Sequence, residues 1–226
     1  MFLDQNILTE RTVMVALLHI DTSVRHEGSV SRELSAAYAE HWRRANPDGA
    51  YTYRDLAEKP VPHLNALTLA TKMVSPADFT PEQAADAAVS QELVDELLAA
   101  DVVLLGVPMY NFSIPSTLKA WLDRVIGPAT AISKETGEGA LVGTRVVVAA
   151  SKGGSYAAGA PRADFDHLEP YLGKVLSQVG LDRNLRFITA EFTLAHLDPA
   201  LAQFREHADA SRSAALESAR ELARIS

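Results

Sequence analysis

Four side chains in one short segment are unusual for a connecting loop. They are Met109, Tyr110, Asn111 and Phe112, within residues 106–119. They follow an apolar run at 102–105 that is typical of a buried strand, and loops at the carboxyl ends of parallel strands bind ligands in open α/β sheets. Backbone amides beside a thioether and aromatic rings suit a flat heteroaromatic ring with polar edges, so a flavin is the first candidate. The loop alone is equally compatible with a connector whose aromatic rings cover the edge of the sheet.

Another loop, at residues 19–31, is rich in hydroxyl groups. It comes earlier in the chain, so we call it the first loop and the segment with Met109 to Phe112 the second loop. The first loop has serine or threonine at positions 22, 23, 29 and 31 and glycine at 28, just before a predicted helix. A phosphate monoester binds well to hydroxyl and N–H donors at a helix N-terminus. The absence of Gly-x-Gly-x-x-Gly and Gly-x-x-x-x-Gly-Lys-Ser/Thr motifs argues against a tightly bound dinucleotide and against ATP or GTP. Serine is also a common helix cap, which alone would account for Ser29 or Ser31.

A third loop, Ser151, Lys152, Gly153 and Gly154, follows another apolar run. Paired glycines let the backbone approach a ligand closely, although a plain tight turn also uses them. If the strand order is 2-1-3-4-5, all three loops lie side by side at the point where the strand order reverses. One ligand then contacts all three, with its phosphate on the first loop and its ring on the other two.

Strand-like and helix-like segments alternate along the chain, as in a parallel sheet covered by helices. The predicted strands are 12–20, 50–55, 102–107, 145–150 and 185–190. The predicted helices are 31–45, 81–99 with Thr80 as its cap, 115–125, 164–179 and 199–225, and residues 56–80 and 127–143 are predicted to be irregular. This pattern indicates the α/β class, with a flavodoxin-like doubly wound sheet of five parallel strands in the order 2-1-3-4-5 and helices on both faces. We expect an N-terminal tail at 1–11 and one domain at 12–226.

Composition excludes several classes of function. The net charge of −8 over 226 residues argues against nucleic acid or an anionic membrane as the main partner. With no cysteine, thiolate catalysis and cysteine-based metal sites are absent, and the seven histidines show no metal-ligand spacing, so no metal is predicted. No apolar stretch approaches the ~20 residues of a membrane span, and the first residues are too polar for a signal peptide. We therefore expect a cytoplasmic protein.

The motifs resemble those of the FMN-dependent NADH:quinone oxidoreductases known as azoreductases, over nearly the whole chain after residue 11. The most specific match is Pro108–Phe112, followed by Ile114-Pro115 and Leu118-Lys119. The resemblance implies that FMN is the cofactor. It assigns one group of residues to the flavin ring, with Asn111 near the flavin edge: Met109, Tyr110, Asn111 and Phe112. A second cofactor-binding group, in a loop where the family has arginine in place of Lys152, is Ser151, Lys152, Gly153 and Gly154. The phosphate-binding residues are Ser23, Ser29, Val30 and Ser31.

The resemblance also implies a function. The protein is expected to use NAD(P)H to reduce quinones, azo compounds or other aromatic acceptors by a ping-pong mechanism, as a homodimer, with the flavin and no catalytic side chain carrying the reaction. Aromatic residues of the family are replaced at Ile132-Ser133-Lys134 and at Gln178, which predicts weaker stacking of flat acceptors. Because these aromatic residues are replaced, a dedicated biosynthetic flavin reductase with one specific substrate is an alternative function. A non-enzymatic flavodoxin-type electron carrier is the less favoured alternative, because carriers lack long excursions like 56–80 and 127–143.

Overall fold

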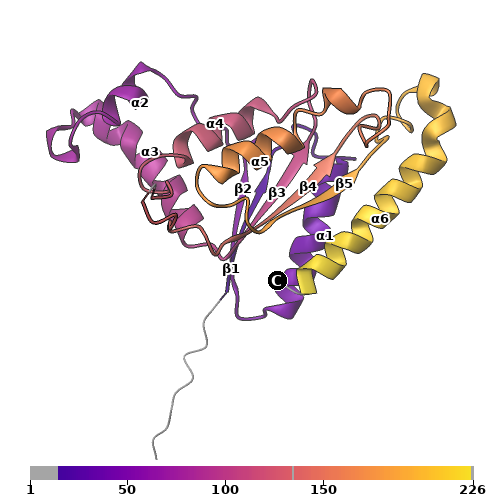
Figure 1. Ribbon diagram of the computed structural model, residues 1–226, viewed down its shortest axis with the longest axis horizontal. Helices are drawn as coiled ribbons and strands as arrows, with labels where there is room; N and C mark the ends of the chain where they lie inside the picture. The colour runs from indigo at the N-terminus through magenta and orange to yellow at the C-terminus, as the bar shows by residue number, and fades with distance from the viewer. Residues whose placement is uncertain (1–14, 134, 225–226) are drawn as a thin grey trace, which may run out of the picture.

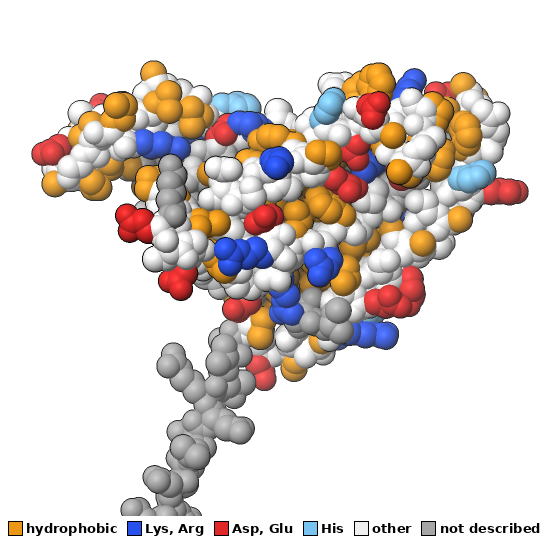
Figure 2. Space-filling model, viewed as in Figure 1, with side chains coloured by type: hydrophobic (Ala, Val, Ile, Leu, Met, Phe, Trp, Pro, Cys, Tyr) orange, Lys and Arg blue, Asp and Glu red, His pale blue; other side chains and the backbone are white. Residues whose placement is uncertain are grey.

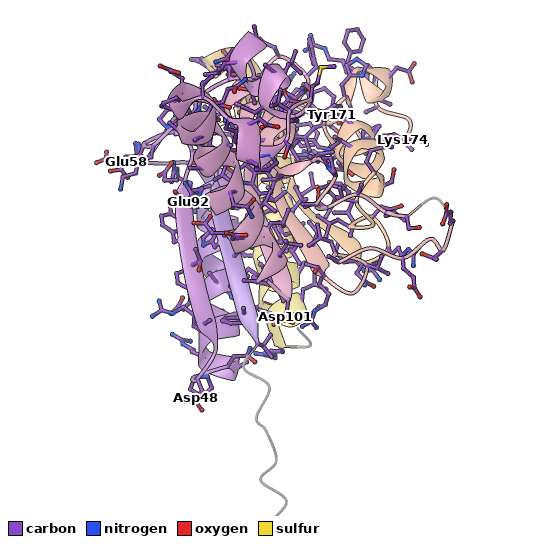
Figure 3. The ribbon with its side chains drawn as sticks, turned by 90° about the vertical axis from the view of Figure 1, so that its left-hand side faces the viewer. Asp48, Glu58, Glu92, Asp101, Tyr171 and Lys174 are labelled. Atoms are coloured by element: carbon purple, nitrogen blue, oxygen red, sulfur yellow. The ribbon has the colours of Figure 1, made fainter. Side chains whose placement is uncertain are left out.

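The computed structural model describes residues 15–133 and 135–224. Its centre is a parallel sheet of five strands in the order β2-β1-β3-β4-β5, which confirms the predicted topology (Figure 1). The strands are β1 (Ala16–Asp21), β2 (Ala50–Asp55), β3 (Val102–Pro108), β4 (Arg145–Ser151) and β5 (Leu185–Ala190). In Figure 3, Asp48 and Asp101, which precede β2 and β3, lie toward the bottom, and Glu58, which follows β2, lies near the top. The carboxyl ends of the strands therefore share the upper edge of the sheet.

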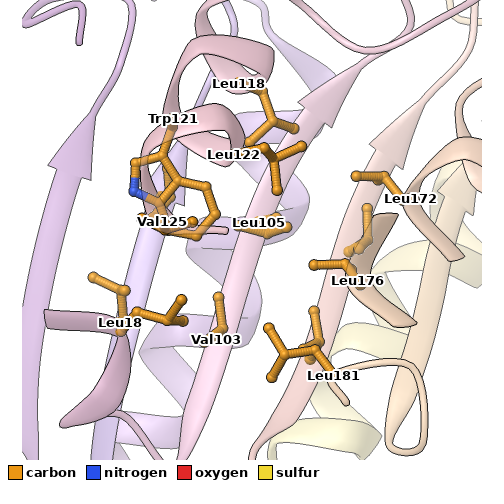
Figure 4. Packing of buried hydrophobic residues seen from close by; sticks show 14 of the residues in the cluster. Leu18, Val103, Leu105, Leu118, Trp121, Leu122, Val125, Leu172, Leu176 and Leu181 are labelled. Atoms are coloured by element: carbon orange, nitrogen blue, oxygen red, sulfur yellow. The ribbon is translucent and has the colours of Figure 1, made fainter. Parts of the chain in front are cut away.

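Helices cover both faces of the sheet. One face is covered by α1 (Val30–Ala45) and α6 (Arg205–Arg224), and the other by α3 (Pro81–Leu98), α4 (Ser116–Val125) and α5 (Glu169–Ser177) (Figure 1). Alternate residues of β3 enter the two cores, so Val103 and Leu105 pack under α4 near Trp121 (Figure 4), whereas Leu104 packs under α1. Burial on both faces explains why this strand reads as a continuous apolar run.

The predicted cap of α3 is confirmed. The Thr80 hydroxyl accepts the backbone N–H of Gln83 at 3.2 Å, and the Gln83 side chain accepts the N–H of Thr80 at 2.9 Å. This reciprocal pair, with Pro81 in the first turn, satisfies donors that a helix N-terminus otherwise leaves unpaired.

Residues 56–80, predicted to be irregular, contain the helix α2 (Ala66–Thr71), so that prediction is wrong in part. We call this segment the arm, because α2 lies beside the start of α3 beyond the edge of the sheet (Figure 1). It is anchored by Arg124 of α4, whose side chain is fully buried. The Arg124 guanidinium donates to the Pro62 carbonyl at 2.8 Å and to the Asp86 carboxylate at 3.0 Å. A long-range anchor of this kind leaves no local sequence signal.

Other predicted boundaries shift. The helix predicted at 164–179 is a 3₁₀ turn, η2 (Ala163–Phe165), followed by α5, because the Asp166 carboxylate accepts the N–H groups of Leu168 and Glu169 and starts a new helix there. The helix predicted at 199–225 is 3₁₀ at Pro199–Phe204 (η3) before α6 begins. The tail 1–11 and the first residues of the strand predicted at 12–20 lie outside the described residues, and β1 continues to Asp21.

The surface carries charges of both signs, interspersed on the face shown in Figure 2, with apolar side chains gathered over the arm at the upper left. The exposed apolar residues of the arm include Leu69 and Met73. No helix within the described part of the chain is both long and apolar enough to span a membrane.

Candidate active site

The loops after β1, β3 and β4 surround one cavity of about 400 Å³. Its walls include the predicted residues Ser23, Ser29, Val30, Met109, Tyr110, Asn111, Ser151 and Gly153. This is the adjacency that the predicted strand order required. The structure adds three wall residues from the segment after β5, which no sequence motif marks: Thr193, Leu194 and Leu197.

Tyr110 joins the first two loops. Its hydroxyl accepts the backbone N–H of Val24 at 3.2 Å and lies 3.3 Å from the hydroxyl of Ser23. The backbone of Tyr110 also pairs in both directions with Ser113. Tyr110 therefore fixes the spacing between the two loops through its side chain.

The first loop ends in unpaired donors. Gly28 has φ +66°, a left-handed conformation that glycine adopts without strain, and it turns the chain into α1. Within the described part of the chain, the N–H groups of Val30 and Ser31 donate no hydrogen bond. The hydroxyl of Ser29 lies 3.3 Å from that of Ser31 and 3.5 Å from the N–H of Arg32, so its capping bond is long. The Ser29 hydroxyl and two free N–H groups at the start of a 16-residue helix fit a phosphate group.

Arg32 stands next to this loop, but its side chain is already occupied. Its guanidinium lies 2.7 Å from the Asp55 carboxylate and donates to the carbonyl of Ser23 at 2.6 Å. Burial disfavours ionised Asp55, but hydrogen bonds from Arg32 and from the backbone of Ala57 and Glu58 outweigh this effect and lower the pKa of Asp55. Arg32 therefore holds the loop in place, a role that sequence reasoning missed. The sequence feature that could have revealed this role is the pair of aspartates at the carboxyl ends of β1 and β2, Asp21 and Asp55.

The second loop has a strained turn. Asn111 and Phe112 have φ values of +48° and +69°, which non-glycine residues rarely adopt and which concentrate at functional sites. Within the described residues, the N–H of Asn111 donates no hydrogen bond, nor do those of Gly153 and Gly154 in the third loop. The free N–H groups of Asn111 and Gly153 share the cavity wall with the half-buried Met109, and together they match the polar edge and the flat face of an isoalloxazine ring.

The two glycines of the third loop differ in their surroundings. A Cβ atom on Gly153 would lie 2.7 Å from Cδ1 of Leu194, so a side chain there has to displace that leucine. A Cβ atom on Gly154 would meet only ring atoms of Tyr156, at 3.9 Å, which is ordinary contact. The protein itself therefore leaves room at Gly154, which lies on the wall of a second cavity next to the first.

Three predicted residues do not face the first cavity with their side chains. Ser31 is fully buried beneath Ser29. The buried Lys152 ammonium lies 2.6 Å from the carboxylates of both Asp166 and Glu169. Burial disfavours its charged form, but these two partners outweigh it and raise the pKa of Lys152. Lys152 therefore ties the third loop to the start of α5.

Phe112, the third of these residues, packs in an aromatic cluster. Its ring centroid lies 5.2 Å from that of Phe165 and 6.3 Å from that of Tyr156. Neither Tyr156 nor Phe165 was predicted as a site residue, because Tyr156 lies beyond the matched motif of the third loop and Phe165 falls in the helix predicted at 164–179. Aromatic surface beside the flavin loop is therefore supplied from within this chain, despite the replacements at 132–134 and 178.

The replaced positions Ile132, Ser133 and Gln178 lie at the opposite edge of the sheet. Ile132 is close to Gly180, just before β5, and the N–H of Ser133 donates to the Glu138 carbonyl at 2.8 Å. Gln178 ends α5 in the same region, and Lys134 lies outside the described residues. In this chain Ile132, Ser133 and Gln178 are not wall residues of the cavity, so the sequence interpretation of a depleted aromatic wall does not apply to the chain's own site.

Comparison with known proteins agrees with this geometry. The family model for the flavodoxin-like fold matches residues 16–214. An azoreductase structure from Bacillus anthracis str. Sterne superposes with a TM-score of 0.82, covering 94% of this chain and 100% of that one at 23% identity, a likeness that concerns the fold. Fold and cavity together define a flavodoxin-like protein.

Two curated relatives are more similar in sequence. The FMN-dependent NADH:quinone oxidoreductase of Parafrankia sp. (strain EAN1pec) is 46% identical over 93% of this chain and 99% of its own length. The protein of the same name from Frankia alni is 45% identical over 89% of this chain and 95% of its own. The chain belongs to the family of FMN-dependent NADH:quinone oxidoreductases, as the resemblance of its loops predicted.

Proposed function

We propose that this protein is an FMN-dependent oxidoreductase that transfers electrons from NADH to quinones or azo compounds by a ping-pong mechanism. The observation that carries the proposal is the arrangement of free donors around one cavity. Phosphate-type donors lie at the start of α1, and ring-edge donors lie at Asn111 and Gly153, with the free N–H of Gly154 on the adjoining cavity. Family membership supports the same cofactor and donor.

Each end of the cavity would hold a different part of FMN. The Ser29 hydroxyl and the N–H groups of Val30 and Ser31 would bind the phosphate, with the buried Ser31 hydroxyl supporting Ser29. The N–H groups of Asn111, Gly153 and Gly154 would orient the polar edge of the ring. When bound, FMN supplies hydride acceptance and electron delivery. The protein contributes position, electrostatics and exclusion of water, which requires no nucleophilic side chain.

The second cavity favours an enzyme over an electron carrier. It has a volume of about 510 Å³ and shares Gly153 and Leu194 with the first cavity. A second small molecule therefore has space directly beside the ring, as a reductase needs for a donor and an acceptor in turn. The same cavity keeps the dedicated reductase with one specific substrate as the alternative.

The proposal extends to assembly and location. We propose a homodimer in the cytoplasm, on the grounds of the family resemblance and the composition. The exposed apolar residues Leu69 and Met73 give the arm surface for a contact between subunits.

Steady-state kinetics test the proposal. We expect the FMN-loaded protein to oxidise NADH much faster when a quinone or azo dye is present. Double-reciprocal plots at several fixed acceptor concentrations should give parallel lines, since donor and acceptor occupy the same site in turn. Intersecting lines would contradict the ping-pong mechanism. Turnover of a single member of a panel of quinones, azo dyes and nitroaromatics would favour the dedicated reductase.

A further inference from the structure

The second cavity has walls suited to a flat ring. Phe192 and Phe204 stack with centroids 5.3 Å apart and planes at 22°, and Tyr156 and Leu201 also contribute. Gly153 and Gly154 form the side next to the proposed ring position. An aromatic molecule in this cavity would therefore contact aromatic side chains on one side and the cofactor on the other.

One cationic side chain, Arg162, belongs to the wall of this largely apolar cavity. It is exposed, and its guanidinium has no hydrogen bond or ion pair within residues 15–133 and 135–224. Two carboxylates of the same region have other partners: Asp166 pairs with Lys152, and Glu191 accepts from the Ser155 hydroxyl and the Tyr156 N–H, both at 2.7 Å. The guanidinium is therefore available to an anion that comes from outside the protein.

A carboxylate or sulfonate matches a guanidinium through two parallel hydrogen bonds. We propose that Arg162 makes this enzyme selective for flat aromatic acceptors that carry an anionic substituent, with the ring in the second cavity and the anion on Arg162. This inference rests on the proposed function, because it assigns the acceptor class of the same site. The phosphates of NADH are the other source of an anion, so the test must separate donor from acceptor.

Two azo dyes that differ only in charge provide the test. One is 4′-dimethylaminoazobenzene-4-carboxylate and the other is its methyl ester. For the FMN-loaded protein we expect kcat/KM to favour the carboxylate. Arg162→Gln should lower kcat/KM for the carboxylate about tenfold, mainly through KM. It should leave kcat/KM for the ester and the KM for NADH nearly unchanged. Arg162→Lys should retain part of the preference for the carboxylate. Arg220→Gln removes the same charge from an exposed ion pair with Glu217 on α6 and serves as the matched control.

Equilibrium binding of both dyes, measured by calorimetry, separates this inference from the proposed function. If Arg162→Gln binds the carboxylate more weakly and the ester equally well, the inference is supported, even if neither dye is reduced. A failure to reduce either dye would count only against the proposed function. Equal effects on both dyes, or no effect on either, would overturn the inference. A rise in the KM for NADH with unchanged dye binding would also overturn it, because Arg162 would then serve the electron donor.

Discussion

Gly154→Val should abolish FMN binding and leave the stability of the protein nearly unchanged. The added Cβ atom meets only Tyr156, at 3.9 Å, and Gly154 is not among the glycines with positive φ, so the fold accepts the side chain. The branched methyl groups would instead project from the loop between the two cavities, at the border of the space that we assign to the isoalloxazine ring. Flavin fluorescence titration and thermal unfolding of the flavin-free protein measure the two effects separately.

Gly143→Val is the matched control for this variant. A Cβ atom at Gly143 would have no atom within 4 Å, and the residue precedes β4 at the opposite edge of the sheet. It should bind FMN with the affinity of the unmodified protein. If Gly154→Val also kept that affinity, the third loop would have no place in the flavin site.

Replacing both Ser29 and Ser31 by alanine should weaken FMN binding at least about tenfold and change riboflavin binding little, because it removes the Ser29 hydroxyl from the phosphate and the Ser31 hydroxyl that supports it. Only FMN has the phosphate, and each hydrogen bond lost from a charged group costs about 1.5–3 kcal/mol. Equilibrium titrations with the two flavins measure the difference directly. Equal losses for FMN and riboflavin would mean that the serines only cap α1.

Thr80→Ala separates capping from phosphate binding. Thr80 caps α3 through a capping box and lies on no wall of the first cavity. Its replacement should cost about 1 kcal/mol of stability and leave the affinity for FMN unchanged. The long 3.5 Å capping bond of Ser29 predicts a smaller loss of stability for the double serine variant than for Thr80→Ala.

Local sequence patterns were sufficient to predict the sheet. Each strand is an apolar or alternating run, and βα alternation leaves few topologies, so β2 and the order of all five strands follow from the sequence. Boundaries that depend on side-chain hydrogen bonds were less predictable. The start of α5 depends on the Asp166 carboxylate, and the position of α2 depends on the buried Arg124, and neither contact is encoded by periodicity.

In the candidate site, too, the sequence predicts the backbone arrangement better than the side-chain contacts. Loops that follow predicted strands were assigned to one cavity because topology alone brings them together. Lys152 and Phe112 belong to these loops, but their side chains are drawn away by Asp166, Glu169 and Phe165, partners that come from a segment without a motif. Sequence thus predicts which backbone segments meet, whereas side-chain direction depends on distant partners.

The most direct test of the central claim follows the flavin through one turnover without oxygen. Protein loaded with one FMN per chain is mixed with a single equivalent of NADH, and a quinone is added after the nicotinamide product has been removed. We predict that NADH bleaches the visible absorbance of the flavin in the absence of quinone. The quinone should then restore this absorbance in full in the absence of NADH. Failure of NADH to bleach the bound flavin, or failure of every quinone and azo dye tried to restore its colour, would contradict the account.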